Sequence, residues 1–217
     1  MPTRRRFLQD SIKSSIGLSG SLLFHTNLMA SEMPADITEL SASNLSMAIQ
    51  QKEVSCAEVM QAYLSRIHRY NPVYNAIVSL VEDDELLNQA RRADAELARG
   101  EYRGWMHGMP HAIKDVRGAA GLPFTSGSPL YAERVAETDH PLAAAIRGAG
   151  AIFIGKTNVP EFGLGSQSYN PVFGATGSAW NPALTSGGSS GGAASGLGTH
   201  MLPCADGSDT MGSLRNP

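Results

Sequence analysis

Apolar residues recur every three to four positions between residues 55 and 70, and this spacing predicts an amphipathic helix. Ser55 and Glu58 match the capping-box pattern, so the helix should begin at Ser55. Asn71 and Pro72 should end it, because a residue before proline disfavours helical backbone angles. Similar patterns predict further helices over 40–48, 84–99 and 140–148.

Three short apolar runs predict strands over 76–81, 109–113 and 151–154. The run 151–154 is apolar on both faces, which is typical of a strand that is covered on both sides. Helices and strands alternate along the chain, and this order predicts a layered α/β fold. No internal repeat and no linker divides the sequence, so we expect residues 31–217 to belong to a single domain.

Gly, Ser, Asn and Pro dominate residues 155–192 and predict loops there. The run 186–192 contains only Gly and Ser, a composition that a flexible linker would also have. The segment 193–198 that follows has the composition of a closely packed helix, and small residues let backbones approach one another. A second turn of small residues spans 206–215, and a serine on such a turn has backbone N–H groups nearby that can bind an oxyanion.

Residues 150–157 formally match the phosphate-loop pattern, but the match is physically poor. Four bulky or apolar residues, Ala-Ile-Phe-Ile, stand where a phosphate loop needs small residues that turn their N–H groups inward. Pro160 also interrupts the helix that should follow. We therefore expect a core strand that ends in a turn at Gly155.

The first thirty residues differ from the rest and predict an export signal. Arg4 and Arg5 precede Phe7 and Leu8, and a weakly apolar stretch of signal-peptide length follows over 16–24. This order resembles a twin-arginine signal, with cleavage near Ala30 or Ala35, and predicts export to the periplasm. The alternative is a basic N-terminus without an address, which would leave the protein in the cytoplasm.

Composition narrows the function classes. The 217 residues carry a net charge of −3 and are 42% hydrophobic and 17% charged, which excludes a disordered acidic chain and a coiled coil. Mixed charges give no footprint for nucleic acid, and no apolar run is long enough to span a membrane. Cys56 and Cys204 are too few for a disulfide framework or a zinc site, and whether they pair stays open.

Lys114 is the strongest single candidate for catalysis. None of the six histidines has a local partner that identifies it as a base, but a lysine desolvated among apolar residues can activate a serine. Lys114 follows the predicted strand 109–113. As a base, its pKa must fall from about 10.4 toward 7–8, which is about 4 kcal/mol, and burial supplies that order of magnitude.

Three blocks, Lys114-Asp115, 187–192 and 208–215, together resemble the amidase signature family of serine hydrolases. Their order and spacing also match, with 75 residues from Lys114 to Ser189 and 24 from Ser189 to Ser213. The resemblance covers about residues 38–217. It implies a layered α/β/α fold with a mixed sheet, and hydrolysis of a small-molecule carboxylic amide to an acid and an amine or ammonia through an acyl-serine.

The resemblance also assigns roles, and it implies no cofactor or metal. Ser213 matches the nucleophile, Lys114 the base, and Ser189 the bridging serine that follows a cis peptide bond, with Ser190 as its close rival. Two residues, Asp209 and Arg215, match positions that brace the loop. The backbone N–H groups expected to form the oxyanion hole belong to Thr210, Met211, Gly212 and Ser213.

Two departures from the family pattern matter. Met211 stands where the family usually has glycine, and a Met would be strained there if the position needs a positive φ. Family members are also considerably longer, so we expect an N-terminal portion whose sheet is incomplete at its C-terminus and which is inactive alone. The alternatives are the amidase-like subunit of a tRNA-dependent amidotransferase and a non-catalytic fragment that retains the site by descent. The oligomeric state stays open.

Overall fold

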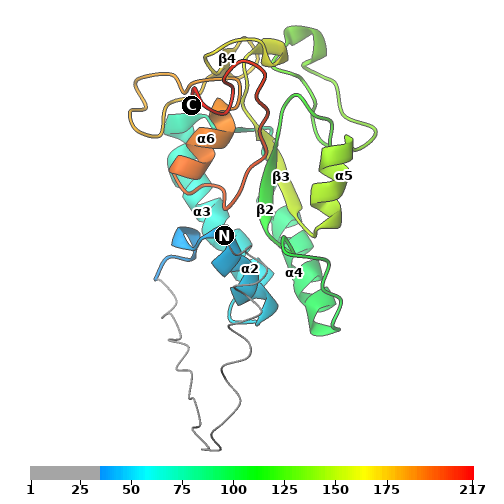
Figure 1. Cartoon of the computed structure of the whole chain (residues 1–217). Coiled ribbons are helices and arrows are strands. Elements are labelled where there is room, and N and C mark those ends of the chain that lie inside the picture. The colour runs from blue at the N-terminus through cyan, green and yellow to red at the C-terminus, as the bar shows by residue number, and fades with distance from the viewer. Residues whose placement is uncertain (1–34) are drawn as a thin grey trace, which may run out of the picture. The chain divides into compact units, whose positions relative to one another are not determined.

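Three short strands form a mixed sheet at the centre of the molecule, with helices on both of its faces (Figure 1). The computed structural model describes residues 35–217, so the predicted export signal over 1–30 lies outside the described residues. The helical segments that precede β3 in the described part are η1 (Ile37–Glu39), α2 (Ala42–Gln50), α3 (Cys56–Tyr74), α4 (Asp83–Ala98), η2 (Pro129–Tyr131) and α5 (Pro141–Gly148). The remaining elements are β1 (Ile77–Val78), β2 (Pro110–Lys114), β3 (Ile152–Thr157), η3 (Glu161–Gly163), β4 (Tyr169–Asn170), β5 (Gly174–Ala175) and α6 (Gly191–Gly198).

The central sheet has the strand order β1-β3-β2. β3 runs parallel to β2 and antiparallel to β1, which confirms the mixed sheet. At the carboxyl end of the parallel pair, Thr157 on β3 lies opposite Lys114 on β2 and Ile77 on β1. The sheet therefore holds the backbone of Lys114 at a fixed place on one edge of the layer.

β3 separates two apolar clusters, because successive side chains of a strand point to opposite faces. Ile152 and Ile154 belong to the large cluster, which contains most of the apolar side chains of α2, α3 and α4. Phe153 belongs to a smaller cluster on the other face with Ala143 of α5. Helices cover both faces, as Figure 1 shows, and the predicted layered α/β/α arrangement is confirmed.

Helix α3 begins as predicted but ends later. Ser55 and Glu58 form the expected reciprocal capping box. The helix continues through Pro72 to Tyr74 and stops at Asn75, whose positive φ of 46° turns the chain out of the helix. The expected end at Asn71 and Pro72 is wrong. The side chain of Asn71 instead accepts hydrogen bonds from the backbone of Ala76 and Ile77 at 2.9 Å, and so joins the last turn to β1.

Gly155 lies inside β3, and the expected turn at this residue is wrong. Its φ is +157°, and an added Cβ would lie 2.9 Å from the carbonyl oxygen of Val78, a separation that real Cβ atoms do not show. The glycine is present because β1 passes too close for a side chain. β3 therefore extends two residues further, through Lys156 to Thr157.

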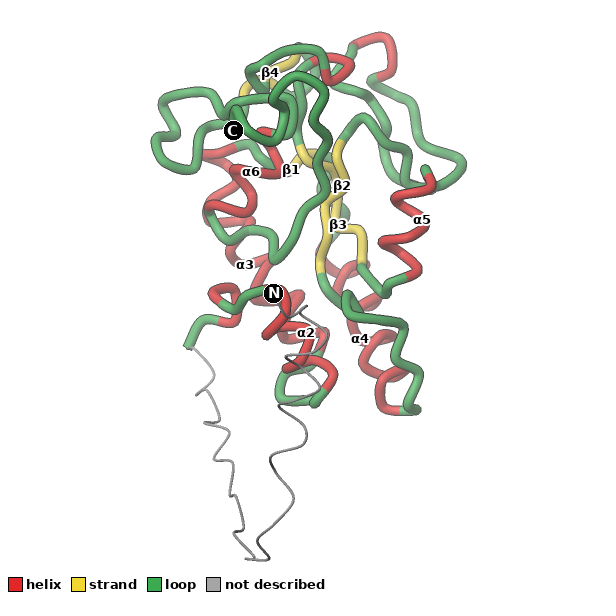
Figure 2. The backbone as a smooth tube through the Cα atoms, in the orientation of Figure 1, coloured by secondary structure: helices red, strands yellow, loops and turns green. Residues whose placement is uncertain are grey.

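Loops make up most of the chain between β3 and α6 (Figure 2). The small residues that follow form a packed helix, as predicted, and not a linker: α6 contacts the strands, and its first residues are buried. A Cβ on Gly192 would lie 2.3 Å from the backbone nitrogen of Asn158. The helix can approach the end of β3 this closely because its first turn has almost no side chains.

Within residues 35–217, we find no helix with the length and apolar character needed to cross a membrane.

Candidate active site

Lys114 is the last residue of β2, and its side chain is fully buried. Its Nζ lies 2.9 Å from Ser189 Oγ, 2.8 Å from Ser190 Oγ and 2.9 Å from Ser208 Oγ. A single cluster of polar groups thus comes from three parts of the chain. β2 contributes Lys114, the segment that leads into α6 contributes Ser189 and Ser190, and Ser208 comes from the segment just before residues 209–215, the C-terminal turn. The structure brings Lys114 and Ser189 together, as the family resemblance implies.

The surroundings of Lys114 favour its neutral form. Burial, assisted by the positive charge of Arg117, lowers the pKa of Lys114 to about 8. All three hydrogen-bond partners of Nζ are hydroxyls, which can donate as well as accept. A neutral amine has two N–H donors and one lone pair, so three hydroxyls satisfy it completely. This is an environment in which a lysine can exchange a proton with a serine.

The peptide bond between Gly188 and Ser189 is cis, as the family resemblance implied. Two contacts link this segment to the C-terminal turn: the backbone N–H of Ser190 donates to the carbonyl of Ser213 at 3.2 Å, and the side chain of Asn216 donates to the carbonyl of Gly188 at 3.2 Å. The two glycine- and serine-rich blocks of the sequence are therefore neighbours in space.

Asp209 and Arg215 clamp the C-terminal turn. The guanidinium of Arg215 donates two hydrogen bonds of 2.9 Å to the carboxylate, which also accepts from the backbone N–H of Gly212 and Leu214. These hydrogen bonds, with the charge of Arg215, hold the pKa of Asp209 well below its usual range. Together these contacts link the two ends of the turn 209–215.

The expected oxyanion hole needs one correction. The N–H of Gly212 donates to Asp209 at 2.7 Å, so this hydrogen-bond donor is already used within the turn. The N–H groups of Thr210, Met211 and Ser213 have no hydrogen bond within the described part of the chain. The positive φ of the turn is at Gly212 (100°) and not at Met211, so the methionine is not strained, and its side chain is 88% exposed.

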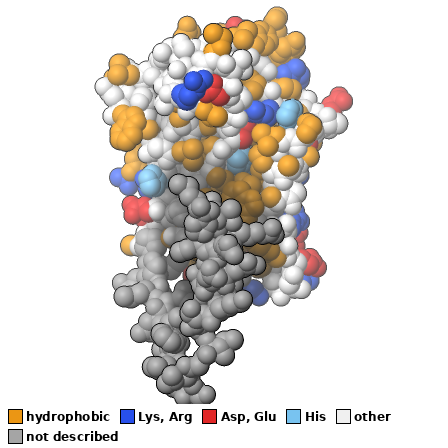
Figure 3. All heavy atoms as spheres, viewed as in Figure 1, with side chains coloured by type: hydrophobic (Ala, Val, Ile, Leu, Met, Phe, Trp, Pro, Cys, Tyr) orange, Lys and Arg blue, Asp and Glu red, His pale blue; other side chains and the backbone are white. Residues whose placement is uncertain are grey.

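Ser213 lines a cavity of about 530 Å³ together with Lys114, Ser189 and Ser208. Apolar side chains that follow β3 also line it, Phe162 of η3 and Leu164 just after that element. The hydroxyl of Ser213 makes no hydrogen bond to any residue from 35 to 217, so Ser213 and Ser189 line the same cavity without a hydrogen bond between them. Figure 3 shows hydrophobic side chains gathered at the end of the molecule where these loops lie.

Three residues near Lys114 were not predicted as part of the site. Ser208 is a direct partner of Nζ, and Asp206 accepts a hydrogen bond of 2.8 Å from the backbone N–H of Lys114. Arg117 forms an ion pair of 2.8 Å with Asp206. The only sequence signal was that all three residues lie within or beside the blocks 114–115 and 208–215; their roles depend on a contact between segments that are about ninety residues apart.

Lys156, which belongs to the phosphate-loop match, lies in the buried strand β3. Its side chain is fully buried, lies 3.5 Å from the carboxylate of Asp115 and donates to the carbonyl oxygen of Arg117 at 2.5 Å. Burial raises the pKa of Asp115 and lowers the pKa of Lys156. This ion pair links β3 to the turn after β2, at the residue that follows Lys114.

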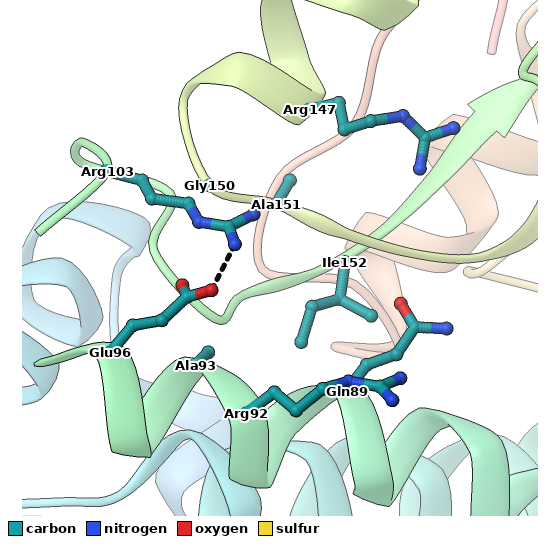
Figure 4. Close-up of a pocket in the computed structure, with 9 residues that line it drawn as sticks. All are labelled: Gln89, Arg92, Ala93, Glu96, Arg103, Arg147, Gly150, Ala151 and Ile152. Atoms are coloured by element: carbon teal, nitrogen blue, oxygen red, sulfur yellow. Dashed lines mark hydrogen bonds and ion pairs between the residues drawn. The ribbon is translucent and has the colours of Figure 1, made fainter. Parts of the chain in front are cut away.

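A second cavity, of about 230 Å³, lies between α4 and the start of β3 (Figure 4). Three arginines surround it, but each is paired with a carboxylate: Arg92 with Glu85, Arg103 with Glu96 and Arg147 with Asp139. Within the described part of the chain, each of these arginines thus already has a carboxylate partner. Nor do residues 35–217 contain three or more His, Cys, Asp or Glu side chains grouped to hold a metal ion.

The two cysteines are separate, and both are free thiols. Cys56 is buried at the start of α3, 3.9 Å from the carbonyl oxygen of His107, and burial raises the pKa of its thiol. Cys204 lies 3.9 Å from Nδ1 of His111, and burial raises the pKa of its thiol to about 11. Neither thiol is ionised near neutral pH, and neither belongs to the lysine–serine cluster.

Comparison with known proteins agrees with this geometry. The chain is 39% identical to the A subunit of the glutamyl-tRNA(Gln) amidotransferase of Acidothermus cellulolyticus, in a match that covers 84% of this chain and 36% of that protein. Solved structures with the same fold include a fatty acid amide hydrolase (TM-score 0.78, 29% identity, 83% of this chain and 32% of that one) and a bacterial aryl acylamidase of the amidase signature family (TM-score 0.75, 28% identity, 82% and 37%).

The chain thus spans just over a third of the length of the curated relatives it matches. The sequence model of the amidase family matches residues 58–217, which include β2, α6 and the C-terminal turn. By this match, and by the lysine–serine cluster that these elements assemble, the chain belongs to the amidase family, the amidase signature enzymes.

Proposed function

We propose that the protein hydrolyses a carboxylic amide to an acid and an amine or ammonia through an acyl-enzyme on Ser213. The observation that supports this most strongly is the placement of Lys114, whose buried amine touches Ser189 at 2.9 Å and has a pKa of about 8. At pH 7, about a tenth of a lysine with this pKa is neutral and able to accept a proton.

In the proposed mechanism, neutral Lys114 takes the proton of Ser189 while Ser189 takes that of Ser213. The Oγ of Ser213 attacks the amide carbonyl, and free N–H groups of the turn 210–213 stabilise the oxyanion. The same relay returns the proton to the nitrogen of the leaving amine as the C–N bond breaks. Water then attacks the acyl-serine by the reverse route and releases the acid.

A fluorophosphonate probe tests the nucleophile, because it reacts with an activated serine whatever the natural substrate is. In the full-length protein, Ser213→Ala should abolish labelling, and Lys114→Ala should slow it severely. Ser189→Ala should slow labelling more than Ser190→Ala, although both hydroxyls contact Nζ. Ser65→Ala, a change at an exposed serine of α3, is the matched control and should label like the wild type. Labelling that persists in Ser213→Ala would refute the assignment.

A subunit of a tRNA-dependent amidotransferase is the second candidate, and the 39% identity to such a subunit favours it. This alternative requires partner subunits. Purification of the tagged full-length protein from its own cell separates the two: a stoichiometric complex that contains other subunits supports the second candidate, and a protein that hydrolyses amides without partners supports the first.

We also propose export by the twin-arginine pathway, which supports a function outside the cytoplasm. The support is the sequence alone: Arg4 and Arg5 before Phe7 and Leu8, followed by a short apolar stretch.

A further inference from the structure

Asp206 joins the strand that carries Lys114 to the segment that carries Ser208. Its side chain is 4% exposed. One carboxylate oxygen accepts the backbone N–H of Lys114 at 2.8 Å, and the other accepts Arg117 Nη1 at 2.8 Å. Two residues further on, the hydroxyl of Ser208 contacts Nζ of the same lysine. Asp206 therefore holds the backbone of Lys114 next to the segment that carries Ser208.

Arg117 contacts both Lys114 and Asp206. Its backbone N–H donates to the carbonyl oxygen of Lys114 at 3.0 Å, and its guanidinium, only 15% exposed, reaches back to Asp206. Its own carbonyl oxygen accepts from Lys156 of β3. Both the backbone and the side chain of Arg117 thus make hydrogen bonds, and these contacts hold the charged guanidinium near Lys114.

The two charges act on Lys114 in opposite directions. After burial, the charge of Arg117 is the main influence that lowers the pKa of Lys114, while Asp206 raises it. The other ionisable groups around this network come from β2 and the turn after it, from β3 and from the C-terminal turn. They are His111, whose Nε2 lies 3.5 Å from Asp206, the pair Asp115 and Lys156, and the pair Asp209 and Arg215. The thiol of Cys204 also lies 3.9 Å from Nδ1 of His111.

We propose that Asp206 and Arg117 are positioning residues for Lys114, which hold its backbone against the segment that leads to the C-terminal turn and set the balance of charge around its amine. The inference rests on the proposed function, in which Lys114 is the base. It extends the site from the lysine and serines to a buried ion pair that is not among the residues lining the cavity of Ser213.

The test is the pH dependence of fluorophosphonate labelling in the full-length protein between pH 6 and 10, because a base must be neutral and labelling falls as it becomes protonated. Arg117→Gln removes a positive charge, so the midpoint of the acidic limb should rise by about one pH unit, the size of shift that one nearby unit charge produces. Labelling at pH 7 should then fall about tenfold. Asp206→Asn keeps an acceptor for the N–H of Lys114 and removes the negative charge, so its midpoint should fall by a similar amount.

Arg117→Lys keeps the charge and is the matched control, with the wild-type midpoint expected. Opposite shifts in Arg117→Gln and Asp206→Asn support the proposal. Midpoints that stay unchanged, or move in the same direction, overturn it and leave the pair a merely structural role. Circular dichroism would show whether Arg117→Gln folds. If it does not, the proposal is tested by Asp206→Asn alone, whose midpoint should lie below that of Arg117→Lys. Ser213→Ala distinguishes a failure of the proposed function from a failure of this inference. If Ser213→Ala is still labelled, the proposed function is wrong. If Ser213→Ala is not labelled but the midpoints of the other variants do not move, only the present inference is wrong.

Discussion

Replacing Lys114 by Met should change how the stability of the full-length protein depends on pH. The pKa of this lysine is about 8 in the folded protein, against an ordinary value of 10.5. Between these two values the unfolded chain binds more protons than the folded one, so the wild type becomes more stable as pH rises. The difference of about 2.5 units corresponds to about 3 kcal/mol, the cost of burying the charged amine.

The measurement is urea unfolding of the wild type and Lys114→Met between pH 7 and 10.5. Relative to the variant, the wild type should gain about 3 kcal/mol between about pH 8 and 10.5 and nothing below about pH 7.5. Other buried groups, such as Lys156, titrate in both proteins and cancel in the difference. Replacing exposed Lys52 by Met is the control, which should keep the wild-type gain. A constant difference between wild type and Lys114→Met would mean that water solvates the amine, and it would refute the argument that burial prepares this lysine to act as a base.

Two further predictions concern other parts of the chain. Gly192→Ala should lower the free energy of unfolding by about 1–3 kcal/mol, because its Cβ would meet the backbone of Asn158 at 2.3 Å. The control is Gly148→Ala at the end of α5, which has open space around it and should not be destabilising. Equal melting temperatures of the two variants would contradict the prediction and show that α6 can move to make room for the added methyl group. Replacing Arg4 and Arg5 with Lys should retain the protein in the cytoplasm, as cell fractionation would show, and undiminished delivery to the periplasm would exclude a twin-arginine signal.

The sequence alone was sufficient for most helices and for the existence of the strands, because these depend on local periodicity and capping. Ser55 and Glu58 are three residues apart, and their capping box forms as the pattern predicts. The errors occurred where a distant segment decides the backbone. Gly155 resembles a turn residue, but the neighbouring strand β1 requires a glycine there inside β3. Pro72 resembles a helix end, but Asn71 joins the last turn of α3 to β1.

The candidate site divides in the same way. Lys114, Ser189 and Ser213 could be named from the sequence because the blocks that contain them resemble the amidase signature family, and the contact of 2.9 Å between Lys114 and Ser189 agrees with that resemblance. Only the tertiary structure shows that Asp206 and Arg117 lie behind the lysine and that Gly212 is engaged by Asp209. The physical reason is that composition and spacing describe what a segment can do locally, whereas burial, charge neighbours and the partner of each N–H group are set by segments that meet only when the sheet and α6 pack together.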